Sequence, residues 1–197
     1  MGGGARSCRV DVIAHVLSVL GSPPLLALPI AFLAGLRAGG YPGMTTSVVA
    51  LVLWVSVVPT LVTVALFRAG RTSTLELRDR RDRLIPSAVT AGCCLAALVQ
   101  LQLAGVPPAV SRLTIGVGVQ MTLLLILTRY WKVSYHTAVA ASLVVVSRSL
   151  DNPALTVGLL VLALSVAWAR IYRRRHTVAQ VAVGALTMAP VALLTSG

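Results

Sequence analysis

The sequence is poor in charge, and poorest in acidic residues. Only 11% of its 197 residues are charged and only five are Asp or Glu, whereas a soluble domain usually carries about 25% charge. Hydrophobic types make up 57% of the chain, and the mean hydropathy is +0.89. Because so little polar surface cannot cover a globule in water, the composition excludes an ordinary soluble domain and predicts a membrane protein.

Cysteine is also scarce, with Cys8, Cys93 and Cys94 the only three. Cys93 and Cys94 fall inside an apolar run, which argues against a disulfide framework, and the spacing fits no metal site. The acidic residues are too few for the paired Asp-rich motifs with which prenyltransferases and terpene cyclases hold magnesium and diphosphate. A prenyltransferase or terpene cyclase is therefore the third and weakest of our hypotheses on function. We predict neither a metal nor a cofactor.

Long apolar runs are abundant, and turn or charge signals separate them. The runs lie at 12–36, 46–67, 87–104, 111–128, 137–149, 154–169 and 177–195. Most approach the roughly 20 residues that span a bilayer as a helix, although 137–149 is short. The first run contains GSPPL at 21–25, where we expect a kink. Since only helices suit such runs in lipid, we predict an all-α integral membrane protein, a single domain over 1–197 with six or seven transmembrane helices.

The seventeen basic residues are sixteen Arg and Lys132. They sit in short loops between apolar runs, so they indicate membrane topology and not a nucleic-acid partner. If the loops alternate sides, fourteen lie on one side and three on the other: Arg37, Arg112 and Arg148. Positive loops stay in the cytoplasm, so we expect a cytoplasmic N-terminus in a bacterial cell membrane. The first apolar run has no clear cleavage site, and we interpret it as a retained helix.

Three polar clusters fall on that crowded face, each at the end of an apolar run. They are LELRDRRDRLIP at 75–86, KVSYHTA at 132–138 and ARIYRRRHTVAQ at 169–180. Taken singly, such clusters are typical of topology signals and of contacts with anionic headgroups. Together they hold cations, a hydroxyl and two imidazoles: Arg83, Lys132, Ser134, His136, Arg170 and His176. Cations and hydroxyls bind phosphate, and one His can attack phosphorus while another protonates the leaving oxygen.

These clusters resemble the three signature motifs of the type 2 phosphatidic acid phosphatase superfamily, K-x6-R-P, P-S-G-H and S-R-x5-H-x3-D. Arg170 and His176 keep the R-x5-H spacing, and Ser134 and His136 keep the Ser and His of the second motif. Arg83 stands three residues before Pro86 instead of one. The resemblance covers 75–180 and implies a helical bundle with a metal-independent lipid phosphatase site at the membrane surface and a side opening for the lipid tail.

By this resemblance, His176 is the nucleophile that forms a phosphohistidine, and His136 is the general acid for the leaving lipid alkoxide. The same resemblance implies that the phosphate oxygens are held by Arg83, Lys132, Arg170 and Ser134. We predict a site at the cytoplasmic face whose partners are a lipid phosphate and the membrane lipids.

The sequence departs from the family pattern at three places. The family's first Lys aligns with Glu76, so Lys132 or Arg78 would supply that charge, and Tyr135 stands where the family has Gly. Gln180 replaces the carboxylate that orients the nucleophile. Its carbonyl can accept the imidazole N–H and fix the tautomer, but it cannot stabilise an imidazolium as a carboxylate does. A second hypothesis is that the side chain of Asp79 or Asp82 supplies the missing carboxylate beside His176, although we expect these two residues to pair with neighbouring Arg residues.

Two functions from different classes remain open. The leading hypothesis is a membrane phosphatase of lipid phosphates, with polyprenyl phosphates or diphosphates as the main substrate candidates. The alternative is a non-catalytic membrane protein of the same fold that binds a lipid phosphate or serves in assembly, and it rests on the three departures. Phosphatase activity that depends on His176 would exclude the alternative.

Overall fold

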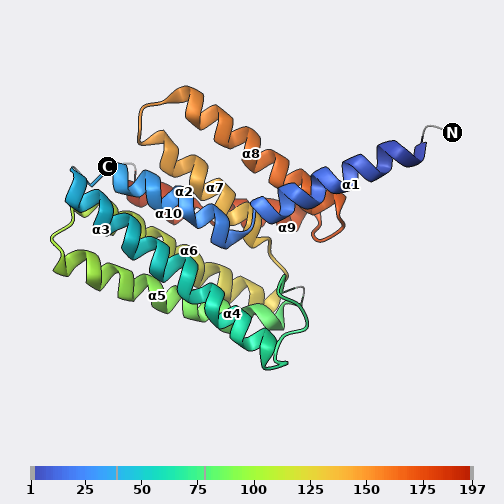
Figure 1. Ribbon diagram of the computed structural model, residues 1–197, viewed down its shortest axis with the longest axis horizontal. Coiled ribbons are helices and arrows are strands. Elements are labelled where there is room, and N and C mark those ends of the chain that lie inside the picture. The colour runs from blue at the N-terminus through green and yellow to red at the C-terminus, as the bar shows by residue number, and fades with distance from the viewer. Residues whose placement is uncertain (1–2, 39, 78, 196–197) are drawn as a thin grey trace.

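The computed structural model describes residues 3–38, 40–77 and 79–195, and every regular element in these ranges is a helix (Figure 1). The helices are α1 (Gly3–Leu20), α2 (Pro23–Leu36), α3 (Tyr41–Leu51), η1 (Val52–Val57), α4 (Val58–Arg68), η2 (Arg81–Arg83), α5 (Leu84–Leu103), α6 (Pro108–Tyr130), α7 (Tyr135–Arg148), α8 (Pro153–Tyr172), α9 (Val178–Leu186) and α10 (Ala189–Thr195). The prediction of an all-helical fold is confirmed.

Five helical segments of the described chain are long and apolar enough to cross a membrane: Pro42–Arg68, Arg81–Leu103, Pro108–Tyr130, Pro153–Tyr172 and Val178–Thr195. Helices α1 and α2 form a sixth span if the pair counts as one, and they are bent by 54° at the expected GSPPL kink. Helix α7 has only 14 residues, as the short run at 137–149 predicted. By their length and composition, these helices are compatible with a helical membrane protein.

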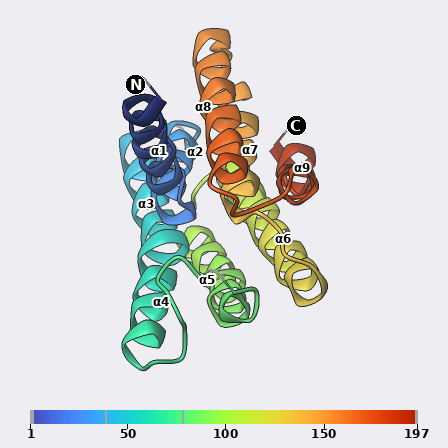
Figure 2. The ribbon, with the colours of Figure 1, turned by 90° about the vertical axis from the view of Figure 1, so that its right-hand side faces the viewer.

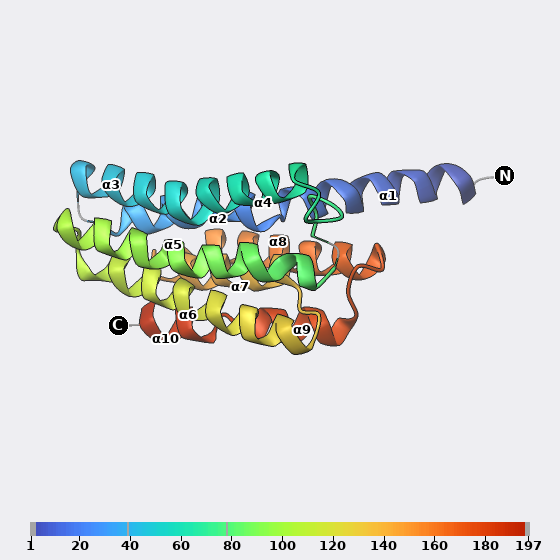
Figure 3. The same cartoon turned by 90° about the horizontal axis from the view of Figure 1, so that it is seen from below.

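Helix α7 lies inside the bundle, where α2, α8, α9 and α10 pack around it and Gln120 of α6 bonds the Ala138 carbonyl oxygen and Ser142 Oγ. Its residues Ala138, Leu143 and Val146 are almost completely buried. Figure 2 looks along the bundle and shows the other helices arranged around α7, and Figure 3 shows α3 and α4 on one side of α5 and α6. Large apolar side chains such as Leu95 and Leu164 are exposed on the outer surface, as expected where a helix faces lipid.

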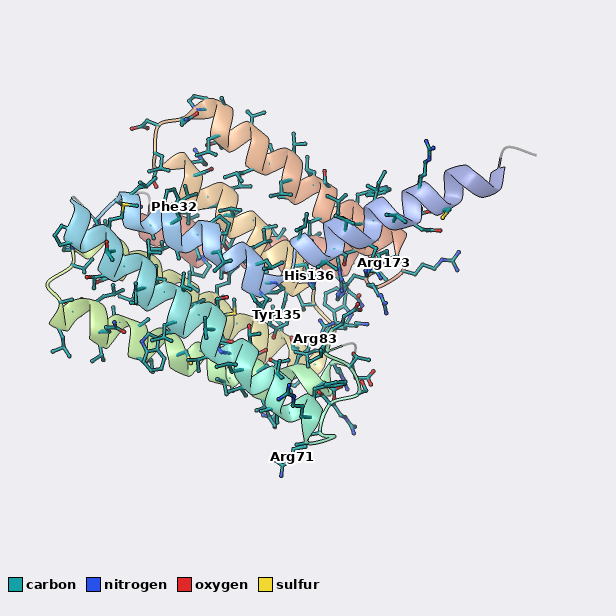
Figure 4. The ribbon with its side chains drawn as sticks, viewed as in Figure 1. Phe32, Arg71, Arg83, Tyr135, His136 and Arg173 are labelled. Atoms are coloured by element: carbon teal, nitrogen blue, oxygen red, sulfur yellow. The ribbon has the colours of Figure 1, made fainter. Side chains whose placement is uncertain are left out.

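The polar clusters meet at one end of the bundle. Helix α1 projects beyond this end, whereas the C-terminus lies at the other (Figure 1). Figure 4 places Arg83, Tyr135, His136 and Arg173 at the same end and Phe32 far from them. The loops before η2 and α7 and the loop after α8 therefore bring three distant stretches of sequence together.

Candidate active site

His176 is positioned by a tight turn at the end of α8. Arg174 adopts a left-handed backbone conformation with φ of 51°, which reverses the chain. The N–H groups of Arg175 and His176 then both donate to the Arg170 carbonyl oxygen, at 3.0 and 3.3 Å. This turn explains the R-x5-H spacing, because it returns the imidazole to the helix end that carries Arg170.

The start of α9 fixes the tautomer of His176. Thr177 and Gln180 form a capping box, in which the Gln180 N–H donates to Thr177 Oγ1 at 3.3 Å and the Thr177 N–H donates to Gln180 Oε1 at 3.2 Å. Since Thr177 N–H is a donor, the amide atom facing it must be the oxygen. The same Oε1 lies 3.1 Å from His176 Nδ1, so Nδ1 carries the hydrogen and Nε2 keeps its lone pair.

Helix α9 is held against the start of α7 by backbone contacts. The Ser134 N–H donates to the Gln180 carbonyl oxygen at 3.2 Å, and Thr137 Oγ1 donates to the Val181 carbonyl oxygen at 3.1 Å. A Cβ added at Gly184 would lie 2.5 Å from the Ser134 carbonyl oxygen and 2.7 Å from Thr137 Oγ1. Only glycine therefore allows this approach, which brings His176, just before α9, beside Ser134 and His136 at the start of α7.

Arg83 is buried and held at both ends of its guanidinium group. Its Nε donates to the Leu77 carbonyl oxygen at 2.7 Å, and Nη1 donates to the Val133 carbonyl oxygen at 2.9 Å. The guanidinium carbon lies 5.8 Å from the centre of the Tyr135 ring, within the range of a cation–π contact. The Tyr135 hydroxyl in turn contacts Ser87 Oγ at 2.8 Å and Thr128 Oγ1 at 3.1 Å.

Arg170 and His136 meet at the kink between α1 and α2. Arg170 Nη1 donates to Ser18 Oγ at 2.6 Å, and the His136 imidazole lies close to the Ser18 backbone. In a continuous helix the Ser22 N–H would bond Ser18, but here it donates to the Val19 carbonyl oxygen, which leaves the Ser18 carbonyl oxygen available to the imidazole. The kink thus supplies a backbone acceptor to the site.

The surroundings of His176 are strongly positive. Burial, reinforced by the charges of Arg83, Arg170 and Lys132, lowers the pKa of His176 to about 3, against the opposing effect of the Gln180 hydrogen bond. Burial and the same two Arg charges also lower the pKa of Lys132, which Asp79 opposes. The N-termini of α7 and α9, with their positive dipole ends, begin beside Ser134 and His176. An anion placed here would relieve this repulsion.

Three buried polar atoms at this point have no hydrogen-bond partner among the described residues: Ser134 Oγ, Arg170 Nε and His176 Nε2. A buried donor or acceptor without a partner costs about 1–3 kcal/mol, so a group of three at one point calls for an explanation such as a bound ligand. Here one hydroxyl, one guanidinium N–H and one lone pair occur together in a cationic site. The hydroxyl and the guanidinium N–H can donate to phosphate oxygens, and the lone pair can attack the phosphorus atom.

The site opens onto a cavity of about 430 Å³ inside the bundle. Arg83, His136 and Arg170 line its polar end, and the remainder is bordered largely by apolar residues of α2, α4 and α6. Glu76 also lines the cavity and pairs with Arg175 at 3.3 Å. The lining is thus charged at one end and hydrocarbon-like beyond it.

The structure brings together most of the residues that the sequence singled out: Arg83, Lys132, Ser134, His136, Arg170, His176 and Gln180. Arg78 lies outside the described residues. The alternative that Asp82 orients His176 is wrong, because its carboxylate accepts from Ser73 N and Oγ at 3.0 and 2.9 Å. Gln180 itself holds that position.

Sequence reasoning missed two residues of the site. Ser18 is a single serine in an apolar run, and only the neighbouring GSPPL kink marks its region. Tyr135 was treated as a departure from the Gly of the family pattern, yet its ring and hydroxyl help to hold Arg83. Among the described residues, no group of three or more His, Cys, Asp and Glu side chains gathers as a metal site would require.

Comparisons of the chain with protein-family models, with curated proteins and with solved structures found no match. The resemblance drawn from the three motifs therefore remains a prediction.

Proposed function

We propose that this chain is a membrane-embedded, metal-independent phosphatase of a lipid phosphate, with polyprenyl phosphates or diphosphates as the leading substrates. The observation that carries the proposal is the buried His176 Nε2, whose tautomer leaves a free lone pair within a ring of cations. The cavity beyond this ring offers an apolar path for the lipid tail. From the loop charges, we propose that the site faces the cytoplasm.

In the first step, His176 Nε2 attacks phosphorus and the bond from phosphorus to the lipid oxygen breaks. Protonated His136 gives its proton to that oxygen, so the lipid leaves as an alcohol and the phosphoryl group stays on His176. Burial and the charges of Arg170 and Arg83 hold the pKa of His136 well below its usual value, so this role requires the bound phosphate, whose negative charge beside His136 favours the protonated imidazole. The guanidinium groups of Arg83 and Arg170 stabilise the charge on the phosphoryl oxygens.

In the second step, water attacks the phosphohistidine and neutral His136 takes the proton from that water. The bond from phosphorus to Nε2 breaks, inorganic phosphate is released, and His176 returns to its starting form. Gln180 keeps the hydrogen on Nδ1 throughout, which preserves Nε2 as the reacting atom.

The test is phosphate release from lipid phosphates in detergent with EDTA present. The panel contains prenyl monophosphates, prenyl diphosphates, phosphatidic acid and phosphatidylglycerophosphate. We expect release that survives EDTA and falls by roughly 10³-fold or more in His176→Asn. His15→Asn is the matched control, because His15 is an exposed residue of α1, and it should retain full activity.

Two results would contradict the proposal. The first is phosphate release that EDTA abolishes. The second is the absence of release from every lipid in a folded sample, which would favour the alternative of a protein that binds lipid phosphate without turnover.

A further inference from the structure

The cavity behind the cationic site is elongated along the bundle. On the continuous helix α3–η1–α4 its lining runs from Val64 to Leu51. These residues are thirteen positions apart, which corresponds to about 20 Å at 1.5 Å per residue. Ala31 on α2 and Met121 on α6 also line it. The cavity therefore reaches well into the bundle from the end that carries Arg83 and Arg170.

One wall of this cavity departs from regular helix. Residues Val52–Val57 form a π-helix, a rare element that is frequent at functional sites. Within it, Ser56 Oγ donates to the Pro24 carbonyl oxygen at 2.9 Å, which ties the wall to the start of α2. The hydrogen bond from this π-helix to Pro24 fixes the position of this wall of the cavity against the start of α2.

Most hydroxyl groups along the cavity already bond to other groups of the protein. Thr60, Thr63 and Thr90 each donate to a carbonyl oxygen of their own helix, at 2.6, 2.8 and 2.8 Å. Deeper still, Ser142 Oγ donates to Gln120 Oε1 at 2.9 Å. Because these groups are satisfied within the protein, the interior suits hydrocarbon better than a polar ligand.

The volume of the cavity limits how much hydrocarbon it holds. At about 30 Å³ for a group the size of water, 430 Å³ accommodates about fourteen methylene-sized groups. An extended chain advances about 1.1–1.2 Å per bond, so fourteen groups reach about 16 Å, close to the length of the cavity. This length is close to the thickness of one membrane leaflet, about 15 Å. Two such chains side by side would need about twice the volume of the cavity.

We propose that the site takes single-chain lipid phosphates, with about fourteen carbons of the tail inside this cavity and the phosphate at Arg83 and Arg170, and that it excludes two-chain phospholipids. The headgroup part of this inference rests on the proposed function. The tail part rests on the length, volume and apolar lining of the cavity.

Photo-crosslinking tests the tail part without any turnover. The probe is a monoalkyl phosphate of about fourteen carbons with a diazirine at the end of its chain, added to the full-length protein in detergent. We expect labelling at Ala31, Leu51 or Met121, mapped by peptide mass spectrometry. Labelling confined to outward-facing residues such as Leu95 and Leu164 would overturn the proposal. Excess unlabelled single-chain phosphate should suppress the deep labelling, whereas excess phosphatidic acid should not.

A pair of Ala→Phe variants sharpens this experiment. Ala31→Phe fills part of the cavity, since Ala31 lines it and is 1% exposed, so the deep labels should be lost. Ala65→Phe is the matched control, because Ala65 is an exposed residue of α4, and it should keep them. Deep labelling that persists unchanged in Ala31→Phe would contradict the proposed path of the tail.

Phosphate release separates this inference from the proposed function. With the same acyl chain, we expect lysophosphatidic acid to be hydrolysed at least about tenfold faster than phosphatidic acid. Equal rates for the two lipids would overturn the single-chain inference and leave the phosphatase proposal standing. Deep labelling without release from any lipid would overturn the phosphatase proposal and leave the single-chain cavity standing.

Discussion

The two walls of the site are built by different kinds of contact. On the α7–α9 wall, backbone meets backbone: the Ser134 N–H bonds the Gln180 carbonyl oxygen, and Gly184 lies against the Ser134 carbonyl. On the α1–α8 wall, the main polar link is one side-chain bond, from Arg170 Nη1 to Ser18 Oγ. The first wall holds His136 and the proposed nucleophile His176, and the second holds Arg170, a cation proposed to bind the phosphate.

This difference teaches where the site tolerates change. A backbone atom cannot rotate away from a new methyl group, whereas a guanidinium group that loses one acceptor can find another or bind water. We therefore expect substitutions in the α7–α9 wall to reduce kcat strongly. Substitutions in the α1–α8 wall should have smaller effects, mainly on KM.

The largest effect is expected for Gly184→Ala. The new methyl group would meet the Ser134 carbonyl oxygen at 2.5 Å, so α9 must move away from α7. A displacement of about 1 Å can reduce a rate by about 10²-fold, and we expect a loss of this size in kcat for phosphate release. Gly158→Ala is the matched control, because nothing lies within 4 Å of its added Cβ. Circular dichroism should show both variants helical, and a fully active Gly184→Ala would refute the close contact.

The Gln180→Glu variant changes the charge of the orienting group and keeps the capping box. Because the pKa of His176 is about 3, its imidazole stays neutral, and hence nucleophilic, until the pH falls to about 3. A carboxylate in contact raises such a pKa by about 1–3 units, so the acid limb of the kcat/KM profile should move to higher pH. Gln102→Glu, at the far end of α5, should leave the profile unchanged. An unmoved acid limb in Gln180→Glu would show that His176 does not control it.

A smaller effect is expected for Ser18→Ala. The substitution removes the acceptor of Arg170 Nη1, and a hydrogen bond to a charged group contributes about 1.5–3 kcal/mol. We expect kcat/KM to fall about tenfold, chiefly through a higher KM. Ser18→Thr keeps the hydroxyl and should restore most of the activity, whereas Ser165→Ala on the exposed face of α8 should change nothing. A KM in Ser18→Ala equal to that of the wild type would contradict the role of Ser18.

The smallest effect concerns stability in acid. The pKa of His176 is about 3 in the folded protein and about 6.5 when unfolded, so between these values the unfolded state binds more protons. The free energy of unfolding should therefore decrease as the pH falls from about 6.5 toward 3. His176→Asn removes this contribution, so its Tm should decrease less than that of the wild type between pH 7 and pH 5. Equal decreases would contradict a buried neutral imidazole.

Much of the architecture could be predicted from the sequence, because apolar runs and helix breakers act locally. The runs gave the helical membrane fold, and the two prolines of GSPPL gave the kink between α1 and α2. The three polar clusters could be assigned to one face, because consecutive helices alternate direction. The sequence also predicted that Gln180 fixes the His176 tautomer, and the hydrogen bonds of the capping box agree with this.

The remainder depends on contacts between distant residues. Gly184 is one of sixteen glycines, and nothing near it in sequence indicates that it meets Ser134. Ser18 lies 152 positions from Arg170, so their bond arises only from the packing of α1 against α8. The sequence likewise left Asp82 available to orient the nucleophile, because its bond to Ser73 depends on how the loop before η2 folds.

The most direct test of the account is to trap the phosphorylated enzyme. A lipid phosphate would be mixed with the protein, quenched in base to preserve phosphohistidine, and digested for mass spectrometry. We predict one added phosphoryl group on the peptide that contains His176, and none in His176→Asn. Phosphate release by the wild type without any adduct, or with the adduct on His136, would contradict the assignment of His176 as the nucleophile.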